Sequence, residues 1–143
     1  MTLEFLIHTL CDLAIKHNLV NSSYSGPSVY ALNPVEIKDY PLFFISPTER
    51  IEVRKNTTEY GLTIYYMDRL LEDSSNEIQI YSVAADTITN FLRQIRELEG
   101  IVEVSDPSIR LFTQSEKMQD RVAGGYTTVN ITVLNNNNCP VYF

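Results

Sequence analysis

The sequence offers few residues that could hold a metal ion or a cofactor. Its 143 residues include two cysteines, Cys11 and Cys139, and two histidines, His8 and His17. The cysteines lie near opposite ends of the chain, whereas a metal site needs three or four convergent ligands. Without a secretion signal we expect free thiols, and histidines that pack against or cap the first helix. The sequence therefore predicts no metal and no cofactor.

Long hydrophobic runs are missing as well. The apolar runs fall far short of the roughly 20 residues that a membrane-spanning helix needs. Residues 1–14 carry Glu4, His8 and Asp12 within an apolar pattern, whereas a signal peptide has a basic start and an unbroken apolar stretch. We expect an amphipathic helix there and no membrane partner.

Basic residues are outnumbered by acidic ones. The chain has 11 Lys and Arg residues against 18 Asp and Glu residues, which gives a net charge of −7. That is the wrong sign for a protein that grips nucleic acid through its phosphates. Negative charge does suit a surface past which DNA must slide without sticking.

Catalytic motifs are absent too, so we expect no enzyme. Gly124 and Gly125 lack the spacing of a phosphate-binding loop, and a glycine pair before a strand is typical of a bulge or a tight entry. Cys11 and His8 stand three residues apart but have no visible third partner for nucleophilic catalysis. Two aspartate pairs are more simply explained as turn caps: Asp68 with Asp73, and Asp106 with Asp120.

The stretch from Asn76 to Gly100 organises the rest of the chain. Residues 77–81 alternate apolar and polar, which favours a half-buried strand. After Ser82 the period becomes helical and predicts a helix over about 83–99 that ends near Gly100. A competing interpretation starts the helix earlier, because Ser74 and Glu77 have capping-box spacing. The apolar stripe of this helix comprises Ala85, Ile88, Phe91, Leu92, Ile95 and Leu98.

A first helix precedes this stretch. Thr2 can cap it, and Lys16 and His17 follow its end, where positive charge complements the helix dipole. Its apolar residues recur at helical spacing and form one stripe: Leu3, Leu6, Ile7, Leu10, Leu13 and Ala14.

Several strands surround the two helices. A loop over 21–28 leads to a short strand over 29–32, and a compact apolar run over 41–46 favours a buried strand. Residues 48–67 predict a hairpin that turns at 56–58. Residues 101–104 and 109–112 form two further strands. The most regular alternation, over 125–133, predicts a long strand that buries Val129, Ile131 and Val133.

The element order predicts a single domain over residues 1–143 with an α+β fold. Two helices pack on one face of a mainly antiparallel sheet, from which the hairpin projects. Residues 135–138 form a polar, flexible loop, and residues 139–143 form an apolar end. This end either contacts a neighbouring protein or folds back as a short edge strand of its own sheet.

Parts of the sequence resemble a known family. They are residues 61–71, Ser75 and Asn76, residues 78–82 with the helix after them, residues 112–114, and above all residues 120–133 with a cysteine after a polar loop. These segments resemble the neck-ring or tail-terminator proteins of tailed bacteriophages, most closely those of crAss-like phages of Bacteroides. The resemblance extends over about residues 1–139.

This resemblance implies a structural virion protein of the neck or tail, assembled in the host cytoplasm. Six or twelve copies would form a ring around the DNA channel, next to portal, neck or tail proteins, and genomic DNA would pass without specific binding. Subunits in a ring need head-to-tail contacts, for which the hairpin and the apolar end are the candidates. The candidate interface residues are Arg50, Glu52, Arg54, Lys55, Tyr60, Val141, Tyr142 and Phe143.

Two alternatives from other classes stay open. The first is a small cytosolic ligand-binding or regulatory domain, since α+β folds host many functions. The second is a hydrolase that uses Cys11 or a carboxylate pair. A regulator would be a monomer or dimer, whereas a ring subunit would form large cyclic oligomers.

Overall fold

The computed structural model describes residues 1–28, 32, 39–113 and 121–135. This part of the chain contains two helices and six strands. In chain order they are α1 (Leu3–Ile15), β1 (Ser22–Ser25), β2 (Leu42–Val53), β3 (Thr57–Arg69), α2 (Glu77–Arg96), β4 (Ile101–Val104), β5 (Arg110–Thr113) and β6 (Val122–Leu134).

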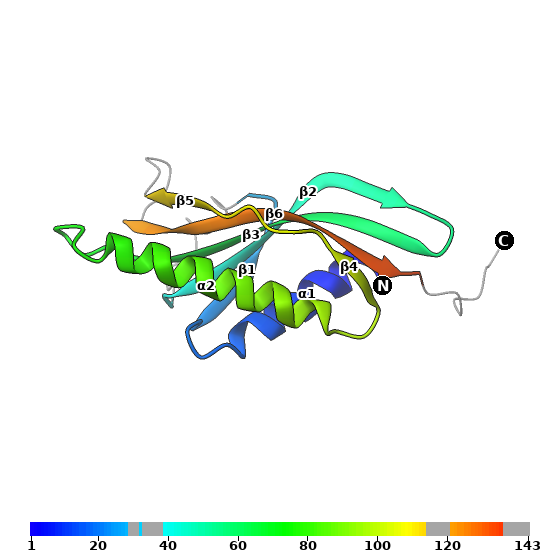
Figure 1. Ribbon diagram of the computed structural model, residues 1–143, viewed down its shortest axis with the longest axis horizontal. Helices are drawn as coiled ribbons and strands as arrows, with labels where there is room; N and C mark the ends of the chain where they lie inside the picture. Colours follow the sequence, from blue (N-terminus) through cyan, green and yellow to red (C-terminus); the bar gives the residue numbers. More distant parts are fainter. Residues whose placement is uncertain (29–31, 33–38, 114–120, 136–143) are drawn as a thin grey trace.

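The six strands form one sheet with both helices on the same side (Figure 1). Its strand order is β1-β2-β3-β6-β4, and β5 also pairs with β6. β1 and β2 are parallel, while the other pairs are antiparallel. These features confirm the predicted α+β class with two helices on a mainly antiparallel sheet.

Helix α1 forms as its sequence predicts. The Thr2 hydroxyl accepts a hydrogen bond from the backbone N–H of Phe5 (3.1 Å), so it satisfies a donor that has no partner within the helix. Leu6, Leu10 and Ala14 are buried at helical spacing. Lys16 follows directly as the C-cap residue.

Helix α2 begins earlier than the strand-then-helix prediction places it. It starts at Glu77, so the predicted strand over 77–81 is wrong. Ile80 and Ala84 are buried one turn apart, whereas Ile78 is 79% exposed. Ala84 therefore takes the core position expected of Ala85, which is only half-buried. A two-residue alternation over five residues is too short to outweigh a helical stripe that extends through seven buried residues.

The loop before α2 differs from a capping box, although the competing interpretation has the earlier start right. The Ser74 carbonyl, not its hydroxyl, accepts the N–H of Glu77 (3.2 Å). The Asn76 side chain instead closes the loop, accepting from the N–H of Leu71 and donating to the carbonyl of Arg69. At the other end α2 stops at Arg96, earlier than predicted, and Glu97 is its C-cap residue. Gly100 has the expected positive φ, 87°, but does not itself end the helix.

A strand also lies where a loop is expected. β1 falls within the predicted loop over 21–28 and pairs in parallel with Leu42–Ile45 of β2. The serine side chains of β1 find partners in neighbouring segments; the Ser23 hydroxyl, for example, donates to the Cys11 carbonyl of α1 (2.9 Å). Of the strand predicted over 29–32, only Leu32 is described; it is buried and not in a strand.

β2 and β3 form the predicted hairpin with a slightly earlier turn. Val53 pairs with Thr58, and the N–H of Arg54 donates to the Thr57 carbonyl (2.8 Å). Residues 54–56 therefore connect the strands in place of 56–58. An irregularity between Pro47 and Ile51 interrupts the pairing.

β6 is the long central strand that its alternation predicts. It pairs with β3 in continuous register from Thr57 to Arg69, so the glycine pair makes no bulge there. Gly124 instead lies so close to the Tyr66 carbonyl that a Cβ would have no room. This close approach explains the glycine.

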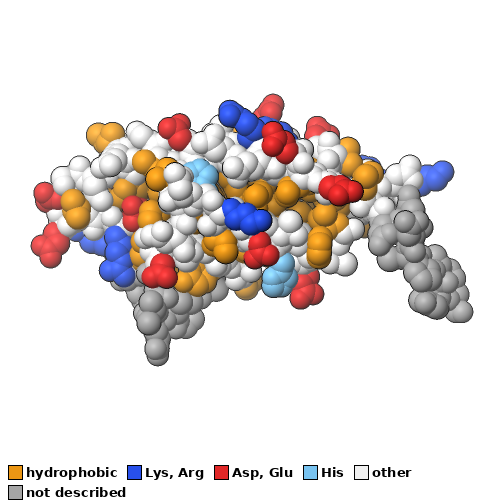
Figure 2. All heavy atoms as spheres, turned by 90° about the horizontal axis from the view of Figure 1, so that it is seen from below, with side chains coloured by type: hydrophobic (Ala, Val, Ile, Leu, Met, Phe, Trp, Pro, Cys, Tyr) orange, Lys and Arg blue, Asp and Glu red, His pale blue; other side chains and the backbone are white. Residues whose placement is uncertain are grey.

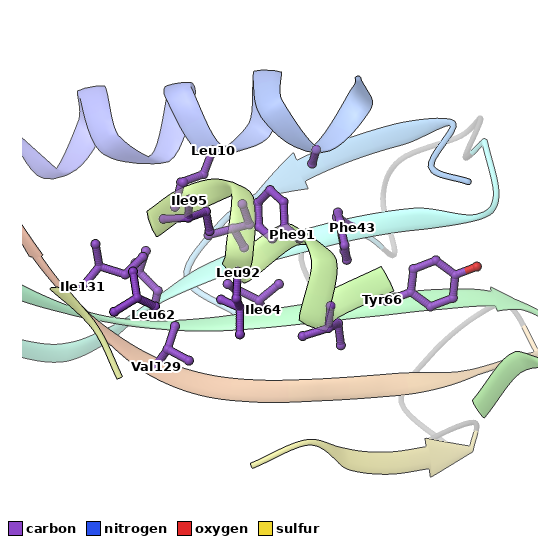
Figure 3. Close-up of a cluster of buried hydrophobic side chains, with 14 of the residues drawn as sticks. Leu10, Phe43, Leu62, Ile64, Tyr66, Phe91, Leu92, Ile95, Val129 and Ile131 are labelled. Atoms are coloured by element: carbon purple, nitrogen blue, oxygen red, sulfur yellow. The ribbon is translucent and has the colours of Figure 1, made fainter. Parts of the chain in front are cut away.

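The main core lies between the helices and the sheet, as predicted for the α2 stripe. Phe91, Leu92 and Ile95 join Val129, Ile131 and Val133 of β6 in one buried cluster. Figure 3 shows these helix side chains beside Leu10 of α1 and the strand residues Leu62 and Val129. The rings of Phe91 and Phe43 lie 4.8 Å apart.

Candidate functional site

The hairpin end of the sheet carries a cluster of compensating charges on the face without helices. We call Arg50, Glu52, Arg54 and Glu59 the charged cluster. Arg50 lies 3.0 Å from Glu52 and 3.4 Å from Glu59, and Arg54 lies 2.6 Å from Glu52. The hydrogen bond from Arg50 lowers the pKa of the Glu52 carboxyl. Two positive and two negative charges thus cancel within one chain.

The other predicted interface residues have different surroundings. Lys55 is exposed at the turn. Tyr60 is buried, and its hydroxyl donates to the Met1 carbonyl (3.0 Å), so its side chain ties the hairpin to the start of α1. Val141, Tyr142 and Phe143 lie outside the described residues.

Two exposed apolar residues were not among the predicted interface residues. Ile51 is 51% exposed and Val53 is 75% exposed. Since neighbouring side chains alternate along a strand, they lie on the face opposite the charged cluster. Among the described strands, β1 pairs with β2 only at Leu42–Ile45, so none pairs with the outer edge of residues 47–53. Their alternation with charged residues was the signal in the sequence.

Asn135 ties the end of β6 to the hairpin turn. Its backbone N–H donates to the Asn56 carbonyl (2.9 Å), and its side-chain amide donates to the Arg54 carbonyl (3.0 Å). Its side-chain oxygen accepts from the Thr58 hydroxyl (2.5 Å). The chain therefore continues to residue 136 from beside the turn.

Four aromatic rings gather farther along the face without helices. The ring of Tyr65 lies 5.4 Å from Tyr126, 6.2 Å from Phe112 and 6.3 Å from Phe44. Phe44 is buried, whereas the other three are half-buried. Stacked and edge-to-face rings of this kind make a firm, partly apolar surface.

A cavity lies at the far end of β3 from the hairpin turn. It has a volume of about 330 Å³ and is walled by the loop after α1, the end of β3 and the first turns of α2. We call it the Tyr66 cavity. Its polar lining includes Tyr66, Asp68 and Gln79, and its apolar lining includes Leu19 and Val83.

Tyr66 is the most unusual residue of this cavity. Only 1% of its surface is exposed, and Figure 3 shows its hydroxyl pointing away from the labelled aliphatic side chains. Burial, with a smaller effect of the Asp68 charge, raises the pKa of Tyr66, so the phenol stays protonated at neutral pH. The sequence suggested a turn cap for Asp68 and no site at Tyr66. Their two-residue spacing, which places both on one strand face, was the available signal.

The described residues that were weighed for catalysis and metal binding form no metal-holding group. Burial raises the pKa of the Cys11 thiol, which disfavours the reactive thiolate. Asp73 accepts the N–H of Ser75 (3.0 Å), as a turn cap does, and Asp120 lies outside the described residues. Within the described chain, no three His, Cys, Asp or Glu residues are grouped to hold a metal ion.

The histidines fit their predicted roles only in part. His17 accepts the N–H of Leu19 (3.2 Å) and so caps the turn after α1. His8 is not packed; its side chain is 76% exposed beside Glu4. Figure 2 shows the side of the molecule that carries the helices, where acidic, basic and hydrophobic side chains are interspersed.

Comparison with models of protein families and with curated proteins finds no match to this chain. Among the described helices, none is both long and apolar enough to cross a membrane.

Proposed function

We propose that the chain is a structural virion protein that forms a homo-oligomeric ring around the DNA channel in the neck or tail of a tailed bacteriophage. The observation that best supports this proposal is the hairpin end, where Ile51 and Val53 are exposed on a strand edge that no described strand covers. Unpaired edges and exposed apolar residues are features that soluble proteins cover when they assemble.

The geometry of this end suits a head-to-tail contact. A ring needs two different surfaces on each subunit, so that each copy offers one surface and receives the other. The hairpin edge would be the offered surface, and the aromatic rings around Tyr65 are a candidate receiving surface. The charged cluster is neutral in sum, so bringing copies together there involves little charge repulsion.

The overall charge is consistent with a DNA conduit. A net charge of −7 per chain is multiplied by the number of copies in a ring. A channel with that balance would repel phosphates weakly and let the duplex slide. We propose no catalytic step for this protein.

The test is the assembly state of the purified chain and of edge variants. Native mass spectrometry and negative-stain electron microscopy should show closed rings of six or twelve copies, alone or with added portal protein. The double variant Ile51→Glu, Val53→Glu should stay folded but fail to assemble, because it places two charges at the contact. The matched control Val102→Glu changes a similarly exposed residue (54%) on another strand and should assemble normally.

The apolar end gives a second arm of this test. Truncation after Asn138 removes Val141, Tyr142 and Phe143, which we propose contact a neighbouring subunit or neck protein. The shortened chain should keep its melting temperature and lose assembly. Assembly of the edge variant and the truncated chain at wild-type levels would refute the proposed interface, and a monomer that never joins a ring or virion would refute the function.

One observation favours the alternative of a small ligand-binding or regulatory domain. The Tyr66 cavity has the size of a small-molecule site and a mixed apolar and polar lining. A monomer or dimer that binds a small ligand, with no cyclic oligomer under any condition tested, would favour this alternative over a ring subunit.

A further inference from the structure

The Tyr66 cavity combines one negative charge with an apolar wall. Among the described lining residues, Asp68 is the only one that is charged at neutral pH; the others are amides, apolar residues and Tyr66. Leu19, Ile80 and Val83 supply much of the apolar surface. A ligand that fits this lining has an apolar body and one positively charged end.

No described cation neutralises the Asp68 carboxylate. One of its oxygens accepts the backbone N–H of Arg69 (2.8 Å), and no ion pair joins Asp68 to a lysine or arginine in the described part of the chain. The guanidinium of Arg69 instead lies 5.0 Å from the centre of the Tyr40 ring. A half-buried carboxylate without a positive partner favours a ligand that supplies one.

The Tyr66 hydroxyl supplies a second polar contact. It is carried by a residue that is 99% buried, it lines the cavity, and it makes no hydrogen bond to the described residues. The hydroxyl oxygen is not among the buried atoms left without a partner, so it is open to the cavity, where a ligand can form a hydrogen bond with it. Two residues on one strand face thus present an acceptor and a hydroxyl to the same space.

The cavity volume limits the size of the ligand. A cavity of about 150 Å³ holds benzene, with its six carbon atoms. The Tyr66 cavity, at about 330 Å³, has room for roughly ten to thirteen non-hydrogen atoms by the same ratio. A short arylalkyl amine and the side chain of a lysine are both smaller than this limit, so either can enter.

We propose that the Tyr66 cavity binds a primary ammonium group on a compact apolar stem, with Asp68 as the counter-ion and the Tyr66 hydroxyl as a hydrogen-bond partner. The site is independent of ring assembly, because a single chain supplies its whole lining. Its failure would therefore leave the proposed ring function untouched, and failure of the ring would leave the site.

The test compares two probes that differ in one group. 2-Phenylethylamine is cationic at neutral pH, and 2-phenylethanol is its neutral counterpart of the same size. Isothermal titration calorimetry on the full chain should show the amine binding at least about tenfold more tightly, since a hydrogen bond to a charged group exceeds a neutral one by that order. Equal affinities for amine and alcohol would overturn the proposal.

Variants assign the effect to the cavity. Asp68→Asn should remove the preference for the amine, and Tyr66→Phe should weaken amine binding about threefold to tenfold. Asp86→Asn makes the same change of charge on the exposed side of α2 and should leave binding unchanged. Val83→Phe fills the cavity without touching either polar group and should abolish binding of both probes. Wild-type binding in both Asp68→Asn and Val83→Phe would refute the site, and melting temperatures establish that each variant is folded.

A third probe distinguishes a protein lysine from a free amine as the source of the ammonium group. Nα-acetyl-lysine N-methylamide carries the lysine side chain on a capped backbone. Asp68-dependent binding of this probe that is tighter than that of 2-phenylethylamine supports the site with a protein lysine as its occupant. The reverse order supports it with a free amine as its occupant, and absence of binding by either amine overturns it.

Discussion

Replacing Phe91 with alanine tests the assignment of the core most directly. The side chain is fully buried, and its ring lies 4.8 Å from that of Phe43. A buried phenylalanine removes about 150 to 250 Å² from water, which at about 25 cal/mol per Å² corresponds to roughly 4 to 6 kcal/mol. Alanine retains part of this burial, and the cavity left behind adds a cost of its own. We therefore expect a loss of about 3 to 5 kcal/mol in the free energy of unfolding.

Urea denaturation followed by circular dichroism measures this loss. For a chain of this size each kcal/mol shifts the melting temperature by about 3 to 4 °C, so Phe91→Ala should lower it by about 10 to 20 °C. Ile78→Ala is the matched control, because Ile78 lies on the same helix and is 79% exposed. It should change stability by less than about 0.5 kcal/mol. A loss below about 1 kcal/mol for Phe91→Ala, or a loss above about 2 kcal/mol for Ile78→Ala, would refute the packing described for α2.

Three further predictions concern the sheet, the charged cluster and DNA. Gly124→Ala should lower the free energy of unfolding by about 1 to 3 kcal/mol in thermal denaturation, because a Cβ there meets the Tyr66 carbonyl. The control is Thr128→Ala, at an exposed position of the same strand. Equal stability of the two variants would contradict the close approach. Glu52 has a pKa below its usual value of 4.5 in the folded chain, so its ionised form stabilises the fold above that value and this contribution is lost as pH falls through the folded pKa. Glu52→Gln should thus destabilise the chain at about pH 7 and not at about pH 3 in urea titrations; a difference that persists unchanged at the lower pH would count against the ion pairs with Arg50 and Arg54. The isolated chain should bind duplex DNA with a Kd above about 100 μM at about 0.15 M salt in fluorescence anisotropy, whereas a Kd below about 1 μM with a steep salt dependence would contradict a conduit role.

Local sequence patterns were sufficient to predict those helices and strands that can be identified without knowing what they pack against. The stripe of α1 and its Thr2 cap lie within one helix, and the alternation over 125–133 lies within one strand. Each of these signals is complete in a short window of sequence, so each leads to the right element type. The core contact between α2 and β6 follows because each of these elements presents a continuous apolar face.

The errors arise where partners distant in sequence decide the structure. The serines of β1 have a weak preference for strands. They form one because β1 pairs with Leu42–Ile45 of β2 and lies against helix α1. Residues 77–81 form a helix because Ile80 continues the buried stripe of residues that follow it. Neither condition can be recognised within the five or so residues concerned.

The candidate sites were less predictable than the fold for the same reason. The Tyr66 cavity exists only where the loop after α1 meets the first turns of α2, which are about 60 residues apart in sequence. Tyr66 and Asp68 share a strand face, but an aromatic and an acidic residue at that spacing are common in ordinary sheets. The charges of the hairpin were identified from their density, whereas their mutual neutralisation depends on Glu59 from the opposite strand.

The tie at Asn135 has a mechanical consequence. A pull on the chain beyond residue 135 reaches three hydrogen bonds at the hairpin turn before it reaches the buried core. The turn and Asn135, about 80 residues apart in sequence, therefore share one anchor point. A load applied at either would reach the other through these hydrogen bonds before it reached the core.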